Sequence, residues 1–200
     1  MSEISRDALN ALAIRRWEGE IVLLSRDEDL DRFAKEIDAE SVVGFDTETR
    51  PAFRVGERYL PSLAQVATSR AVWIFPLQRL DCSAALCALL ANAAIVKAGV
   101  SMADDLRNLK ALFPFEERAV VDVGKLARRQ GIKQSGVRNL AGLLLGYRIP
   151  KGGATSNWAS ARLTAQQLVY AATDAWVCRE LFLRLAPSEE ALAGLISHTK

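Results

Sequence analysis

The order of short apolar segments along the chain limits the fold more than any other feature. Three segments, at 41–46, 63–67 and 71–77, read as strands, and a tight turn joins the last two. This succession predicts an antiparallel meander. Further strands at 95–100 and 119–123 alternate with helical segments. Antiparallel strands followed by strand-helix alternation predict an α/β fold, with a mixed five-stranded sheet flanked by helices.

One domain accounts for most of the chain, because no repeat, low-complexity tract or Pro/Gly-rich linker divides it. We predict a helical N-terminal extension at 1–20, a single domain at 21–186 and a short C-terminal helix or tail at 187–200. A short strand at 21–24 precedes the core. Helical periodicity predicts helices at 7–17, 27–37, 84–91, from residue 102 and at 124–130, and the remainder is helical apart from a loop at 147–160.

The composition excludes several classes of protein. The chain has 200 residues and a formal net charge of +2, so it is not a polycation, and any binding of nucleic acid has to be local. Its three cysteines are odd in number and lack CxxC spacing, which argues against a disulfide framework or a zinc site. The apolar run at 84–91 is far shorter than the roughly 18 residues of a membrane span. We therefore expect a cytoplasmic protein without a targeting segment or a membrane partner.

Two acidic residues, Asp46 and Glu48, are two positions apart on a predicted strand. Because side chains alternate along a strand, both carboxylates leave the same face, with their Cβ atoms about 7 Å apart. Such carboxylates repel each other unless a cation lies between them, and hard divalent cations take oxygen ligands of this kind. The pair is therefore a candidate metal site, with a solvated strand end as the alternative.

A second acidic group follows the strand at 95–100. Ser101 is predicted to N-cap the next helix, with Asp104 three positions later and Asp105 in the first helical turn. Acidic residues there also stabilise a helix through its dipole. Helix stabilisation therefore explains either aspartate about as well as function does.

A third group lies on a long helix near the C-terminus. Thr164 and Gln167 form the pattern of a capping box, and Tyr170 and Asp174 stand four positions apart on one helical face. The helix around them is nearly all apolar, so a charged Asp174 is costly without a compensating partner. A metal ligand and an aromatic hydroxyl can thus point toward the same place in a site. A half-buried tyrosine beside a surface acid gives the same pattern.

These residues stand within three short motifs. The motifs are FDTETRP at 45–51, KAGV and DDL at 97–100 and 104–106, and SNW with YAATDA at 156–158 and 170–175. Together they resemble the three exonuclease motifs of the DEDD superfamily, and the tyrosine four positions before the last aspartate resembles its DEDDy branch, with ribonuclease D and Werner-type exonuclease domains as the nearest likeness. The resemblance covers about 21–185, and three ordered motifs are far more specific than any one of them.

The resemblance implies a ribonuclease H-like fold and a 3′-to-5′ exonuclease that removes 5′-mononucleotides from DNA or RNA. It also implies two divalent cations, Mg²⁺ or Mn²⁺, as cofactors. The metal ligands that it implies are Asp46, Glu48, Asp105 and Asp174. Asp46 would bridge the two ions, whereas Asp105 would hold one of them mostly through water. Tyr170 is expected to orient the attacking water.

Three other residues bear on the membership of the site. Asp104 competes with Asp105 for the third position, but the Asp-Leu pair at 105–106 fits the family register better. Asp122 is interpreted as a structural acid outside the site. His198, the single histidine, lies outside every motif, so a histidine general base is not expected.

The nucleic-acid contacts are less clearly marked in the sequence. The segment at 50–58 mixes basic and aromatic residues, and we assign Arg50 and Phe53 to a surface that tracks the strand, with a solvated loop as the alternative. The loop before the last helix carries Arg148, Lys151 and Trp158. Lys151 is a candidate phosphate ligand, whereas Trp158 either contacts nucleic acid or anchors the loop in the core.

The expected partner is a single-stranded or 3′-ended nucleic acid. Neither the preference for DNA or RNA nor the oligomeric state follows from the sequence. A catalytically inactive nucleic-acid-binding or scaffolding protein with the same fold is the alternative function. The presence of all four acids and the tyrosine favours the enzyme.

Overall fold

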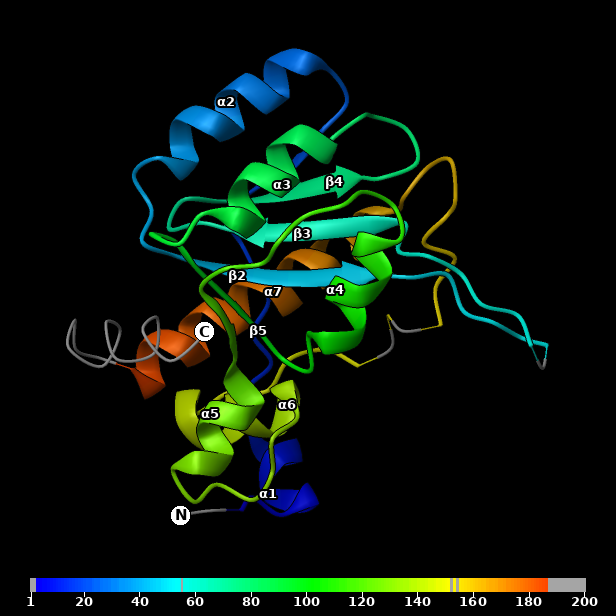
Figure 1. Cartoon of the computed structure of the whole chain (residues 1–200). Coiled ribbons are helices and arrows are strands. Elements are labelled where there is room, and N and C mark those ends of the chain that lie inside the picture. The colour runs from blue at the N-terminus through cyan, green and yellow to red at the C-terminus, as the bar shows by residue number, and fades with distance from the viewer. Residues whose placement is uncertain (1–2, 55, 152, 154, 187–200) are drawn as a thin grey trace.

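A single sheet forms the centre of the fold. The computed structural model describes residues 3–186 except 55, 152 and 154. Within these residues six strands pair in the order β1-β4-β3-β2-β5-β6 (Figure 1). The strands are β1 (Glu20–Leu23), β2 (Val42–Glu48), β3 (Leu63–Ala67), β4 (Ala71–Pro76), β5 (Val96–Gly99) and β6 (Val120–Asp122).

The strand pairing confirms the predicted α/β fold with a mixed sheet. β2, β3 and β4 form the antiparallel meander, β5 pairs in parallel with β2, and β6 pairs in parallel with β5. The predicted number of five strands is wrong, because β1 pairs in parallel with β4 and becomes the sixth strand. β1 satisfies the backbone groups along the edge of β4 and buries Val22.

Helices cover both faces of the sheet. The helices are α1 (Arg6–Ala11), α2 (Asp27–Ile37), α3 (Ser83–Ala91), α4 (Ala103–Lys110), α5 (Val123–Arg129), α6 (Val137–Leu140), the π-helical segment η1 (Ala141–Leu145) and α7 (Ala165–Leu185). α2 and α3 lie over one face, and α7 crosses behind the sheet on the other (Figure 1). Within the described part of the chain, no helix is long and apolar enough to cross a membrane.

α7 packs very closely against β2. A Cβ atom at Gly44 would lie 1.9 Å from the carbonyl oxygen of Ala175, so only glycine permits this contact. The helix begins with the predicted capping box, in which the side chains of Thr164 and Gln167 each accept a hydrogen bond from the other residue's backbone N–H. The close contact fixes the height of the helix above the strand that carries Asp46.

The terminal segments differ from the prediction. α1 ends at residue 11, so the helix predicted at 7–17 is too long. Beyond it, the Arg15 N–H donates to the carbonyl oxygen of Arg148 over 2.8 Å, and such tertiary bonds replace helical ones. The boundary of the predicted extension stays a prediction. The helix or tail predicted at 187–200 lies outside the described residues.

The region between α5 and α7 is also less helical than predicted. Irregular chain separates α5 from α6 at 130–136, and the described residues of 146–164, between η1 and α7, form no helix. Gly146, with a φ of 74°, ends η1 in the left-handed conformation that favours glycine. The long irregular segment at 146–164 returns the chain to the start of α7, beside the candidate site.

Candidate active site

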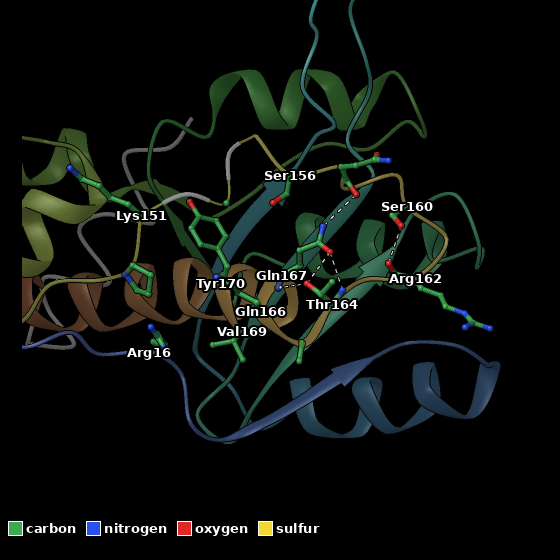
Figure 2. Close-up of a pocket in the computed structure, with 14 residues that line it drawn as sticks. Arg16, Lys151, Ser156, Ser160, Arg162, Thr164, Gln166, Gln167, Val169 and Tyr170 are labelled. Atoms are coloured by element: carbon green, nitrogen blue, oxygen red, sulfur yellow. Dashed lines mark hydrogen bonds between the residues drawn. The ribbon is translucent and has the colours of Figure 1, made fainter.

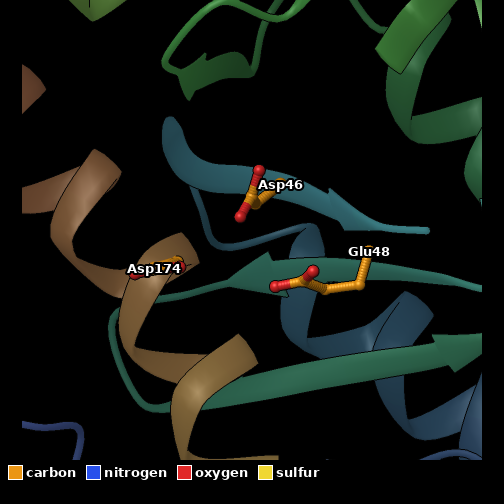
Figure 3. Close-up of side chains that lie close together, drawn as sticks. All are labelled: Asp46, Glu48 and Asp174. Atoms are coloured by element: carbon orange, nitrogen blue, oxygen red, sulfur yellow. The ribbon is translucent and has the colours of Figure 1, made fainter. Parts of the chain in front are cut away.

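Three carboxylates converge where β2 ends beside α7. Asp46 and Glu48 come from β2 and Asp174 from α7, and one carboxylate oxygen of each lies within 4.8 Å of the others (Figure 3). The first two share a strand face because they are two positions apart, and α7 brings the third across the sheet face. The structure therefore brings together three of the four predicted metal ligands.

The cluster is electrostatically unfavourable without a cation. Burial, and then the charges of Asp174, Glu48 and Asp105, raise the pKa of Asp46 well above its ordinary value. Burial and the neighbouring carboxylates raise the pKa of Glu48 to about 8. Burial raises the pKa of Asp174 to about 6, although a hydrogen bond from Tyr170 and the charge of Arg138 oppose the shift. Such a donor set fits a hard divalent cation, which replaces the protons that the carboxylates would otherwise hold.

Asp105 reaches the site from the other side of β2. It lies on α4, and its Oδ1 accepts a hydrogen bond from the Thr47 hydroxyl over 2.6 Å. Burial raises the pKa of Asp105, and the Thr47 bond opposes that shift. Asp105 is outside the group of three carboxylates, yet its charge acts on Asp46 and Glu48. Thr47 was missed as a site residue, because strand alternation places it on the opposite face from Asp46.

Asp104 and its neighbour Asp105 have different surroundings, and only Asp105 lies beside the carboxylate cluster. Asp104 is exposed and pairs with Arg107 over 2.7 Å, so it faces away from the cluster. The predicted N-cap at Ser101 is wrong, because Met102 is the N-cap and Ser101 adopts a left-handed φ of 60°. Asp122 N-caps α5 by accepting a bond from the Lys125 N–H, which agrees with its interpretation as a structural acid.

Tyr170 stands one turn before Asp174 on α7, and its hydroxyl lies close enough to the Asp174 carboxylate for each group to shift the pKa of the other. Burial and then the charge of Asp174 raise the pKa of the phenol further above its ordinary value, so the hydroxyl keeps its proton at neutral pH. The loop before α7 presses against this ring. A Cβ atom at Gly153 would lie 2.1 Å from Tyr170 Cε1. The centroid of the Trp158 ring lies 6.1 Å from the centroid of the Tyr170 ring. Gly153 belongs to none of the motifs, so it was not identified from the sequence.

A cavity of about 680 Å³ adjoins Tyr170 and the start of α7 (Figure 2). Three basic residues line it, and among the described residues that line it there is no acidic side chain. These basic residues are Arg16, Lys151 and Arg162. Lys151 is the predicted phosphate ligand, whereas Arg16 and Arg162 were not identified from the sequence because they belong to no motif.

The other predicted nucleic-acid contacts divide into accessible and inaccessible residues. Phe53 is 82% exposed, and the exposed Arg50 stacks its guanidinium 3.9 Å from the ring centre of Tyr59. Trp158 is only 1% exposed, so it anchors the loop in the core, and its contact with nucleic acid stays a prediction. Arg148 donates from Nε to the carbonyl oxygen of Leu12 over 2.9 Å, which ties it to the N-terminal segment, and its contact with nucleic acid stays a prediction.

Known proteins are similar to this chain in sequence and in fold. A family model described as 3′-5′ exonuclease matches residues 21–189. The human exonuclease mut-7 homolog is 30% identical over 188 residues, covering 80% of this chain and 22% of that protein. Ribonuclease D of Haemophilus influenzae is 33% identical over 146 residues, covering 71% of this chain and 35% of that protein. The chain thus spans about a third or less of the length of these relatives.

The fold has a close counterpart in a solved structure. The Nibbler EXO domain of Aedes aegypti superposes with a TM-score of 0.75 at 22% identity, covering 95% of this chain and 94% of that chain. This likeness concerns the fold alone. The family model, in contrast, covers most of the chain and all three motifs. The chain therefore belongs to the 3′-5′ exonuclease family.

Proposed function

We propose that this protein is a two-metal-ion 3′-to-5′ exonuclease, which hydrolyses phosphodiester bonds at the 3′ end of DNA or RNA and releases 5′-mononucleotides. The observation that carries the proposal is the convergence of Asp46, Glu48 and Asp174 within 4.8 Å in a chain of an exonuclease family. Their raised pKa values make a divalent cation, Mg²⁺ or Mn²⁺, the fitting counter-charge.

Each acid has a separate part in the proposed site. Asp46, Glu48 and Asp174 would ligate divalent cations directly, whereas Asp105, which Thr47 orients, would reach one of them mostly through water. When bound, two divalent cations lower the pKa of a water molecule and stabilise the leaving 3′ oxygen. The protein contributes the fixed position of the ligands on β2 and α7.

Tyr170 would orient the attacking water. Its hydroxyl lies beside Asp174, and its raised pKa keeps it protonated at neutral pH. A protonated phenol can hold a water molecule by a hydrogen bond but cannot remove its proton, so its effect is on geometry. This role corresponds to the DEDDy branch that the motifs resemble.

The surroundings support a nucleic-acid strand as the substrate. The cavity beside Tyr170 offers Arg16, Lys151 and Arg162 to phosphate groups. The segment after β2 presents the exposed Phe53, whose ring can stack on an unpaired base. These side chains would contact phosphate groups and the faces of bases, which DNA and RNA share. They do not by themselves select DNA or RNA.

End-labelled oligonucleotides test the proposal directly. DNA and RNA strands that carry a label at the 5′ or the 3′ end should be shortened from the 3′ end when Mg²⁺ or Mn²⁺ is present, with 5′-mononucleotides as products. A chelator should abolish the reaction, and Asp174→Asn serves as the matched inactive control. Cleavage in excess chelator, cleavage from the 5′ end or internal cleavage would contradict the mechanism. Binding without any cleavage would indicate an inactive nucleic-acid-binding protein.

A further inference from the structure

A buried glutamine lies directly beside the metal site and has no assigned role. Gln65 is on β3 and is 0% exposed. In the antiparallel register of β2 and β3 it stands directly opposite Asp46. Opposite residues of an antiparallel pair project from the same face, with Cβ atoms about 4.5–5.5 Å apart. The Gln65 side chain therefore leaves the sheet on the face of the carboxylates.

The amide of Gln65 has no partner among the described residues. Neither its Nε2 nor its Oε1 makes a hydrogen bond, although both atoms are buried. Apart from Asp46, the neighbours that strand pairing and core packing place on this face are apolar. Leu63 and Ala67 flank it on β3, Ile74 pairs with it on β4, and Ala171 and Ala175 of α7 belong to the same apolar layer.

An unpaired amide in an apolar layer destabilises a fold. An apolar side chain of the same volume would pack there without this cost, so packing alone does not explain glutamine. The side chain that stands opposite it is Asp46, one of the three converging carboxylates of the proposed metal site. Ligating carboxylates are commonly held in place by hydrogen bonds from residues outside the ligand set.

We propose that Gln65 is a positioning residue for the metal site. When divalent cations are bound, its Nε2 donates a hydrogen bond to the carboxylate of Asp46, and its Oε1 accepts one from a water molecule in the site. Gln65 thereby fixes the orientation of the carboxylate without touching the substrate. Because this role depends on the proposed exonuclease site, metal binding and strand cleavage have to be measured separately.

Two substitutions separate positioning from packing. Gln65→Met keeps the volume and removes both polar atoms, so the metal-free protein should gain thermal stability while Mn²⁺ binding weakens by about 10- to 100-fold. Gln65→Asn keeps an amide but shortens its reach, so it should also weaken Mn²⁺ binding. Ser62→Ala is the matched control, because Ser62 also has a buried hydroxyl without a partner among the described residues but precedes β3, three positions from Gln65. It should leave Mn²⁺ affinity unchanged.

The measurements are calorimetric titration with Mn²⁺, thermal unfolding in chelator, and single-turnover cleavage over a range of oligonucleotide concentrations. We expect the cleavage rate of both Gln65 variants to fall while the concentration for half-maximal rate stays the same. Wild-type Mn²⁺ affinity in Gln65→Met, or in Gln65→Asn if the first variant does not fold, would overturn the role. If wild-type protein cleaves no strand but Gln65→Met still weakens Mn²⁺ binding, the positioning role stands and the exonuclease proposal fails. Absence of Mn²⁺ binding by the wild type would overturn both.

Discussion

The carboxylates of the candidate site lie on regular elements, whereas its basic residues lie on loops. Asp46 and Glu48 are fixed by a strand paired on both sides at Gly44, and α7 packs on the same glycine. Lys151 and Arg162, in contrast, belong to the irregular segment at 146–164.

This difference matches two different demands on the site. Metal ligands need positions accurate to a fraction of an ångström, which strands and helices provide. Contacts with a nucleic acid of variable sequence need adaptable side chains, which loops provide. We therefore expect substitutions in the carboxylate region to affect turnover, and substitutions in the loop region to affect affinity for nucleic acid.

The largest effect is expected for Asp46→Asn and Asp174→Asn. Each removes one of the proposed metal ligands, so turnover should fall by several orders of magnitude. The metal-free protein should remain folded and be as stable as the wild type or more so, because one of the repelling carboxylates is gone. Single-turnover cleavage and thermal unfolding in chelator check the two parts. If activity disappears because the protein has unfolded, these acids are structural and the comparison of the two regions fails.

The carboxylate region should also give the protein a distinctive pH dependence. The pKa of Glu48 rises from 4.5 to about 8, and that of Asp174 from 3.8 to about 6. Carboxyl groups with raised pKa values in the folded state stabilise it while protonated, so the free energy of unfolding of the metal-free protein should decrease as pH rises from about 4 to 8. Mn²⁺ displaces these protons, so its affinity should increase over the same range, by about tenfold per pH unit for each proton released.

Thermal unfolding and Mn²⁺ titration between about pH 4 and pH 9 measure both trends. Asp46→Asn is the control, since it should flatten the stability profile. A metal-free stability that rises with pH across this window would contradict the raised pKa values.

Tyr170→Phe should have an intermediate effect. It keeps the ring that packs against Gly153 and removes only the hydroxyl, so we expect a loss of about 5- to 150-fold in single-turnover rate with Mn²⁺ affinity retained. Gly153→Ala should cause a similar or smaller loss, because its Cβ would displace the same ring.

The two changes act through one hydroxyl, which makes their combination informative. The Gly153→Ala/Tyr170→Phe double variant should be no slower than Tyr170→Phe alone, and a double-mutant cycle on the cleavage rate measures this. Additive losses would show that Gly153 acts elsewhere. A Tyr170→Phe variant as inactive as Asp174→Asn with its metals bound would show that the tyrosine does more than orient water.

The smallest effects are expected in the loops. Lys151→Ala and Arg162→Ala should weaken oligonucleotide binding by about 2- to 5-fold each and leave the saturated cleavage rate unchanged. Each lost phosphate contact should also reduce the slope of log affinity against log salt by about 0.7. Fluorescence anisotropy across a salt series provides both values. The control substitution is at Lys133, an exposed lysine that pairs with Glu3 and does not line the cavity. A fall in the saturated cleavage rate without loss of oligonucleotide affinity would show that these basic side chains act in catalysis.

The local spacings in the sequence determined much of this protein. Side chains two apart on a strand share a face, and side chains four apart on a helix share a face, so spacing alone pairs Asp46 with Glu48 and Tyr170 with Asp174. The meander and the capping box at Thr164 are likewise local, because short turns and the first helical turn involve neighbouring residues.

Contacts between distant segments were decided only by the tertiary structure. The sequence contains no local signal that β1 joins β4, that Gln65 faces Asp46, that Thr47 holds Asp105, or that Gly153 presses on Tyr170. Strand register and loop packing depend on which surfaces the whole chain can bury together, and many partners satisfy the same local pattern. Spacing along the chain and the resemblance of the three motifs therefore predicted the candidate ligands. The residues that contact those candidates were decided by the packing of β2, β3 and α7.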